Sequence, residues 1–178
     1  KNKEVKRYDY TLIPEVMFGI NKKLMIHVDF FFSDRAQKNL MAEGGSIYAK
    51  YRFYSKDDIQ SHFRMAGYAR YSFNNVNIRR DEIGTYSANT GYELGLVATQ
   101  LLHKVALSTS VSYQKVLQND QLFYLKNASA INYTFSIGKL ILPKEYINYK
   151  QTNMNVMMEF LGQTNSRNGS SYLDVAPS

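Results

Sequence analysis

Apolar and polar residues alternate with a period of two along most of this chain. Between Leu24 and Phe32 every second side chain is apolar, whereas His27 and Asp29 fall between them. A helix would scatter these charges around its surface, whereas a strand places them together on one face. The alternation predicts eight strands and the start of a ninth near Tyr172, with the eight at residues 12–21, 23–33, 45–54, 61–73, 91–101, 104–116, 128–142 and 152–162.

The connections between the expected strands alternate in length. Residues 21–22, 55–60 and 102–103 form short turns, and longer polar links lie at 34–44, 74–90, 117–127 and 163–170. Residues 143–151 are the exception, because this longer link falls on the short-turn side. Short turns at one end and long loops at the other are typical of outer-membrane barrels. No linker or long repeat interrupts the pattern, so we expect one domain over residues 1–178.

Composition narrows the classes of function. The chain has 178 residues, a formal net charge of +7 and 14% aromatic residues, and it contains neither Cys nor Trp. The lack of Cys excludes disulfides, thiolate metal sites and cysteine nucleophiles. No uncharged run approaches the roughly 20 residues that a membrane-spanning helix needs, but a spanning strand needs only about 9–11. The pattern therefore predicts an all-β, antiparallel, up-and-down transmembrane barrel.

The two faces of the expected strands differ in a way that assigns them to lipid and lumen. Strand 104–116 presents small polar residues on its second face, including Ser108, Ser110 and Ser112, which suit the crowded interior of a narrow barrel. The apolar face carries tyrosines suited to an interfacial girdle. We therefore expect lipid contact at Val28, Phe30, Tyr51, Phe53, Met65, Tyr71, Leu94, Leu96, Val111, Tyr113, Tyr133, Phe135, Val156 and Phe160. A water-soluble lipocalin-like barrel is the alternative reading of the same alternation.

The opposite face is expected to hold a mutually neutralising charge network in the lumen. Asp29–Lys50 is the pair that we expect first, with Glu93 approaching Arg64 or Arg70. The predicted network consists of Glu15, His27, Asp29, Lys50, Arg52, His62, Arg64, Arg70, Glu93 and Glu159.

The chain resembles bacterial outer-membrane β-barrels, on its hairpin pattern and on one motif-like stretch. That stretch runs from Pro143-Lys144-Glu145-Tyr146 through Tyr149-Lys150-Gln151-Thr152-Asn153-Met154-Asn155 to Glu159-Phe160-Leu161-Gly162, and it is similar to barrels labelled as outer-membrane transporters. The resemblance implies a Gram-negative outer membrane but no particular solute. Two features differ from this family. The sequence starts at Lys1 without a signal peptide, and it ends at Ala176-Pro177-Ser178, whereas such barrels usually end on a strand with a terminal aromatic residue. From these two differences we expect an incomplete piece of a barrel of 10–12 strands.

Enzymatic and nucleic-acid functions are not favoured by the residues present. A phospholipase-type barrel needs Ser, His and Asn on the lipid face, where this chain shows no such set, and a protease of the omptin type needs His at the outer rim. His103 is expected in a turn. His27 and His62 are expected to form ordinary hydrogen bonds in the lumen, since a metal site would need Asp29 or Glu93 as a further ligand at the same height. The basic residues Lys1, Lys3, Lys6, Arg7, Arg79 and Arg80 suit phosphates of lipopolysaccharide better than nucleic acid, since no stacking aromatics accompany them.

Two functions remain open from the sequence. The first is a passive channel or transporter for small solutes, in a porin-like manner. The second is a structural or assembly subunit of a larger envelope complex, with a lumen filled by side chains and other outer-membrane proteins as partners. No cofactor and no metal are expected for either function. We expect outer-membrane lipid around the barrel in both cases.

Overall fold

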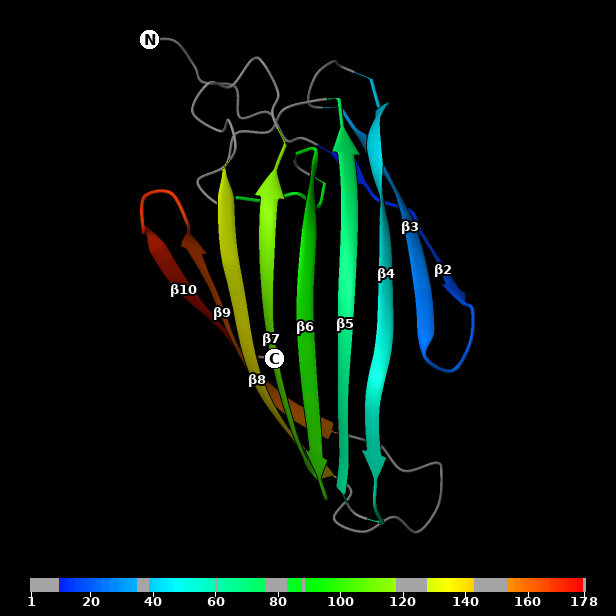
Figure 1. Cartoon of the computed structure of the whole chain (residues 1–178), viewed down its shortest axis with the longest axis vertical. Helices are drawn as coiled ribbons and strands as arrows, with labels where there is room; N and C mark the ends of the chain where they lie inside the picture. The colour runs from blue at the N-terminus through cyan, green and yellow to red at the C-terminus, as the bar shows by residue number, and fades with distance from the viewer. Residues whose placement is uncertain are drawn as a thin grey trace.

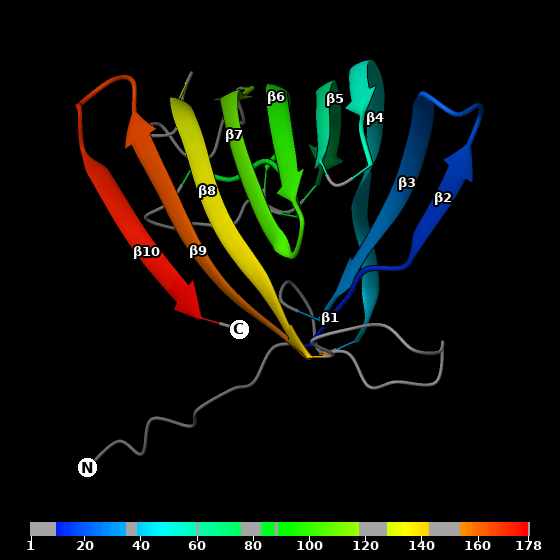
Figure 2. The same ribbon diagram turned by 90° about the horizontal axis from the view of Figure 1, so that it is seen from below.

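The fold is a single antiparallel, up-and-down β-sheet that curves into a trough (Figures 1 and 2). The computed structural model describes residues 10–34, 39–59, 61–75, 83–87, 89–117, 128–142 and 154–177. The strands are β1 (Thr11–Leu12), β2 (Glu15–Gly19), β3 (Leu24–Ser33), β4 (Met41–Asp57), β5 (Ser61–Asn74), β6 (Gly91–Leu102), β7 (Val105–Val116), β8 (Ser129–Leu142), β9 (Met154–Asn165) and β10 (Ser171–Pro177). The prediction of an all-β, up-and-down antiparallel architecture is confirmed.

Each strand pairs with its neighbour in the chain, except that β1 and β2 both pair with β3. The first expected strand, 12–21, is therefore interrupted. Pro14 lies at the break and has no N–H to donate, although its carbonyl accepts a hydrogen bond from Phe30 N at 3.1 Å. Proline is tolerated here because β1 and β2 form an edge of the sheet.

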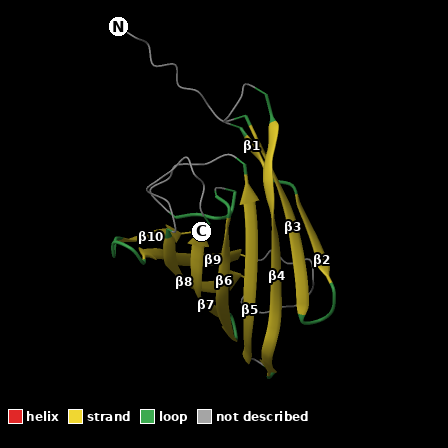
Figure 3. Ribbon diagram, turned by 45° about the horizontal axis from the view of Figure 1, so that its top comes forward, coloured by secondary structure: helices red, strands yellow, loops and turns green. Residues whose placement is uncertain are grey.

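The sheet is open. β2 and β10 lie at its two edges (Figure 2), and the pairing among the described residues contains no bridge between them. The expectation of at least eight antiparallel strands with unpaired edges is confirmed, whereas closure into a barrel is not shown. Figure 3 shows strands and loops only, and no helix in the described part of the chain is long and apolar enough to cross a membrane.

The two ends of the sheet have different connections. Short turns join β2 to β3, β4 to β5 and β6 to β7 at one end, which we call the short-turn end. His103 lies in the β6–β7 turn with a φ of 52°, as expected for a tight turn. Links to β4, β6, β8 and β10 leave from the opposite, long-loop end. The first part of the stretch that carried the family resemblance, residues 143–153, lies outside the described residues. So do the basic residues Lys1, Lys3, Lys6, Arg7, Arg79 and Arg80.

Two irregularities in β4 change which side chains face the inside of the trough. The register shifts between Arg52 and Tyr54, where Arg52 lies opposite Ala66 and Tyr54 opposite Met65. An unbroken alternation from Ile47 places Tyr54 on the polar face, and this expectation is wrong. The bulge at Phe53 turns Tyr54 outward, where its ring lies beside that of Phe63 with 5.9 Å between ring centroids. A second register shift lies where β4 pairs with β3. Phe31 lies opposite Gly44 and Phe32 opposite Ala42, so Glu43 is the extra residue of β4.

The convex face of the trough exposes apolar side chains, and the concave face buries polar ones. Leu94, Leu96 and Phe135 are exposed, whereas Asp29, Ser46 and Ser72 on the concave face are almost fully buried. Among the predicted lipid-facing residues, Val28, Met65 and Phe160 are half-buried and the other eleven are exposed. Lys115 and Lys139, which also face outward by register, lie near opposite ends of the strands.

Gly95 allows Tyr68 to lie flat across the concave face. The two residues are opposite each other on β5 and β6, and a Cβ at Gly95 would meet Tyr68 Cζ at 2.4 Å. The ring cannot simply move away, because Tyr68 Oη donates a hydrogen bond to Glu93 Oε1 at 2.9 Å.

We therefore expect Gly95→Ala to lower the free energy of unfolding by about 1–3 kcal/mol, the usual cost of overpacking. Gly138→Ala is the matched control, since a Cβ there meets Met157 Cγ at an ordinary 3.7 Å. Urea unfolding of both variants in the same detergent measures the difference. Equal stabilities would show that Tyr68 has room that the structure does not indicate.

Candidate functional site

The candidate site is the concave face, which a folded-in loop segment crosses near the long-loop end. Residues 83–87, here called the inward segment, follow β5 in the chain and precede β6 (Figure 1). Ile83, Thr85 and Ser87 are buried. The sequence pattern gives residues 74–90 only as a long polar link, and it does not predict that part of this link folds over the concave face.

Two glutamines hold the start of the inward segment through its backbone. Gln163 Oε1 accepts a hydrogen bond from Ile83 N at 2.9 Å, and Gln163 Nε2 donates to Ile83 O at 2.8 Å. Gln114 Nε2 donates to the same carbonyl oxygen at 2.9 Å. Because Gln114 lies on β7 and Gln163 on β9, the segment is attached to one wall of the trough at two points.

Asn132 on β8 connects the two glutamines. Its Nδ2 donates to Gln114 Oε1 at 2.8 Å, and its Oδ1 accepts from Gln163 Nε2 at 2.7 Å. The Ile83 side chain packs beside this array against Val116, Ala128 and Ala130. Polar groups buried away from water require partners, and this array supplies them for the backbone N–H and carbonyl of Ile83.

The other end of the inward segment contacts the opposite wall. The Tyr86 ring packs edge-on against Phe31 of β3, with 5.5 Å between ring centroids. The Arg70 guanidinium of β5 lies 4.5 Å from the Tyr86 ring and 5.0 Å from the Tyr48 ring. The segment thus joins β7–β9 to β3–β5 across the concave face.

Arg70 also forms the main ion pair of the concave face. Its Nη1 lies 3.5 Å from Glu93 Oε2, and the other carboxylate oxygen accepts the Tyr68 hydroxyl. The expected approach of Glu93 to Arg70 is confirmed. Both side chains are largely buried, with 24% of Arg70 and 12% of Glu93 exposed. Each charge therefore needs the opposite charge of its partner to offset the loss of hydration.

The Asp29–Lys50 pair is absent, and that prediction is wrong. The register puts Asp29 opposite Ser46, whose hydroxyl donates to the Asp29 carboxylate, while Lys50 lies opposite Met25. Four residues along a strand correspond to about 13 Å, which is too far for an ion pair. His27 instead pairs with Glu15 through Nδ1.

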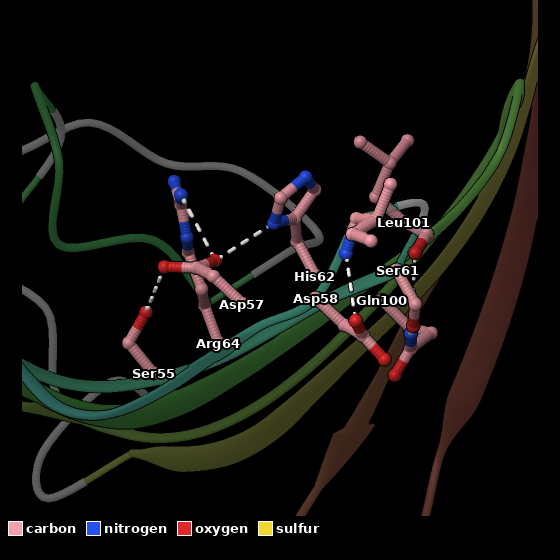
Figure 4. A network of polar contacts seen from close by, with 9 residues as sticks. Ser55, Asp57, Asp58, Ser61, His62, Arg64, Gln100 and Leu101 are labelled. Carbon is pink, nitrogen blue, oxygen red and sulfur yellow. Dashed lines mark hydrogen bonds and ion pairs between the residues drawn. The ribbon is translucent and has the colours of Figure 1, made fainter.

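His62 and Arg64 share a partner, Asp57, that the alternation of the sequence does not predict. Asp57 accepts contacts from His62 Nδ1 at 2.9 Å and from Arg64 Nη2 at 3.3 Å, and Ser55 donates to it at 3.2 Å (Figure 4). The bulge at Phe53 rotates Asp57 to the concave side, whereas an unbroken alternation would place it outside. Asp57 is the last residue of β4, beside the turn, and the His62 contact followed by the nearby Arg64 charge lowers the pKa of its carboxyl.

The buried carboxylates of the concave face lie toward one end of the trough and most of its cations toward the other, although Arg70 lies beside Glu93 and Asp57 beside Arg64. Asp29, Glu43 and Glu93 are buried toward the long-loop end, whereas Lys50, Arg52 and Arg64 lie toward the short-turn end. Glu159 lies across the sheet from Arg64, in the row that passes through Thr99, Ser108 and Ser136. The expected single neutralising network of all ten residues is not what the contacts form.

Several buried polar atoms near the inward segment have no hydrogen-bond partner among the described residues. They include Asp29 Oδ1, Ser72 Oγ and Thr85 Oγ1. Such atoms suit a water-filled space or a passing polar solute. In the described ranges no group of three or more His, Cys, Asp or Glu residues is arranged to hold a metal ion.

Comparison with family models, with curated proteins and with solved structures gave no significant match to this chain. Any assignment of function therefore depends on the geometry of the two faces and on the inward segment.

Proposed function

We propose that this chain forms the wall of a bacterial outer-membrane β-barrel that acts as a passive channel for small polar solutes, with the inward segment as its constriction. The observation that carries the proposal is the inversion of the sheet, whose convex face exposes apolar side chains while its concave face buries polar ones. A water-soluble barrel has the opposite arrangement. Lipid on the convex side, with lipopolysaccharide at the long-loop end, would satisfy the exposed face.

The height of the apolar band supports this proposal. Lys115 and the Val105–Lys139 pair mark its two ends on β7, and ten residues separate them. Ten residues at about 3.3 Å each, tilted by about 40°, give roughly 25 Å, which equals the apolar band of outer-membrane barrels. Lysines at both ends have stems that can lie along the apolar surface with the charge in water.

Closure of such a barrel has a parity requirement. Because β1 and β2 share one position beside β3, the edge strands β2 and β10 run in the same direction. Antiparallel closure then needs an odd number of strands between them, and one strand would give a barrel of ten positions. Backbone groups left unpaired in lipid each cost several kcal/mol, so closure is a condition of the proposal.

A structural or assembly barrel with a filled lumen is the second candidate. It is favoured by the three hydrogen bonds that join Ile83 to Gln114 and Gln163, because they fix the inward segment across the trough. Conductance of the purified protein in a planar bilayer separates the two functions. Channel events support the first, and their absence together with a stoichiometric co-purifying protein supports the second.

The constriction itself is tested by Gln163→Leu, which removes two of the three hydrogen bonds to the Ile83 backbone. A buried group left without its partner costs about 1–3 kcal/mol. The population of molecules in which the inward segment is detached from Gln163 should therefore rise about tenfold. We expect faster hydrogen exchange of the Ile83 amide and larger or more frequent channel openings.

Gln100→Leu is the control for this variant. Gln100 donates to Ser61 Oγ and Leu101 O at the short-turn end and does not touch the inward segment. If Gln163→Leu and Gln100→Leu conduct alike, and Ile83 exchange is unchanged, the inward segment is not the constriction.

A further inference from the structure

A cavity of about 410 Å³ lies at the short-turn end of the concave face, away from the inward segment. Its volume falls within the range of small-molecule sites. β3, β4, β5 and β6 and the β2–β3 turn provide its walls. Its cationic lining residues are Lys22, Lys23, Lys50, Arg52 and Arg64.

The lining is basic and contains no acidic residue among the described part of the chain. Arg64 contacts Asp57, but no ion pair is found for Lys50 or Arg52 among the described residues. Lys50 is half-buried. Cations that are gathered without carboxylates repel one another, and a bound anion relieves that repulsion.

The local structure holds one of these cations, Arg52, in place. Arg52 Nη2 donates to the carbonyl oxygen of Lys22 at 2.5 Å, which fixes the guanidinium beside the β2–β3 turn. That turn is itself closed by Asn21, whose Oδ1 accepts from Lys23 N at 2.8 Å and Leu24 N at 2.9 Å. A fixed guanidinium is well suited to bind carboxylate or phosphate oxygens.

The floor of the cavity is apolar. Met25, Ala66 and Val97 lie beneath the cations, with Ala66 and Val97 opposite each other on β5 and β6. An apolar floor under a basic rim accommodates the carbon skeleton of an organic anion as well as its charged group. Inorganic phosphate would use the rim alone.

We propose that this cavity binds a small anionic solute that carries carboxylate or phosphate groups, with Lys50 and Arg52 as the principal contacts. The inference deepens the proposed channel function, on which its transport role rests, by giving the class of solute. Binding itself does not require conduction. The buried carboxylates toward the long-loop end make the opposite end of the trough unfavourable for the same anion.

The test is calorimetric titration of the full chain in detergent micelles with inorganic phosphate and, separately, with succinate. We expect both to bind, succinate more tightly because of the apolar floor. Lys50→Gln combined with Arg52→Gln should weaken binding at least about tenfold, as expected for the loss of charge-assisted contacts. Lys50→Arg, which keeps the charge, should retain binding, and thermal unfolding establishes that each variant is folded.

Lys139→Gln is the matched control, since it removes a lysine near the same end of the strands on the convex face. If Lys139→Gln weakens anion binding equally, the effect comes from general surface charge, and the site is overturned. Absence of anion binding to the wild type also overturns it. Conduction in a planar bilayer is scored separately. Conduction without anion binding overturns the site alone, and anion binding without conduction overturns the channel alone.

Discussion

Replacing Phe135 by Arg is expected to lower the free energy of unfolding in a lipid bilayer by about 2–4 kcal/mol. Phe135 is exposed on the convex face, packs beside Phe160 with 6.1 Å between ring centroids, and lies opposite Thr109. Thr109 is close to the middle of the interval on β7 between Val105 and Lys115. The new charge would therefore lie near the bilayer midplane, where its desolvation is most costly.

The neighbouring residue gives the control. Ser136 faces the concave side, opposite Ser108 and Glu159, so an Arg there gains a carboxylate neighbour and avoids lipid. Reversible unfolding in phospholipid vesicles measures both variants. If Ser136→Arg destabilises the protein as much as Phe135→Arg, the assignment of the convex face to lipid fails. Val28→Arg and Leu96→Arg extend the test to other strands of the same face.

Arg70→Met is expected to lower the free energy of unfolding by about 3 kcal/mol. The substitution leaves the largely buried Glu93 carboxylate without its cation, and removal of one partner from a buried pair typically costs about 3–5 kcal/mol. The remaining Tyr68 hydrogen bond and partial exposure reduce that cost, whereas the lost contacts with Tyr48 and Tyr86 add to it.

Two further variants separate charge from packing at this position. Arg70→Met combined with Glu93→Gln should recover much of the loss, because no unpaired charge remains. Arg167→Met, in the exposed β9–β10 turn, should change the stability by less than about 0.5 kcal/mol. Urea unfolding in detergent compares them. An Arg70→Met variant as stable as Arg167→Met would show that the Arg70–Glu93 pair contributes nothing measurable.

The alternation of residues was enough to predict the strands, because in a sheet the side-chain direction reverses at each residue. The bounds of β5, β6 and β7 lie within one residue of the predicted ranges. Glu93 was expected to approach Arg64 or Arg70 because all three lie on one face of adjacent strands. The long link between β5 and β6 left the register open, and the structure places Arg70 opposite Glu93. The face that each residue occupies therefore follows from the sequence wherever the strand is regular.

The errors arise where a strand is not regular. The bulge at Phe53 moves Tyr54 outward and Asp57 inward, and nothing in the period of two marks the residue that is inserted. The wrong prediction of an Asp29–Lys50 pair arises from register, since β3 and β4 pair so that Asp29 lies opposite Ser46. The sequence placed Asp29 and Lys50 on one face, but not at one height, because a longer link between β3 and β4 permits several registers.

The sequence by itself determined the strand order, the division between an apolar and a polar face, and the alternation of short and long connections, all of which depend on contacts between residues near in the chain. Only the tertiary structure decided that residues 83–87 fold inward, because that position depends on Gln163, eighty residues away, and on Gln114. It also decided that Lys50, Arg52 and Arg64 surround one cavity while the buried carboxylates gather toward the other end. Curvature brings such residues together across many strands, and no local pattern in the chain records it.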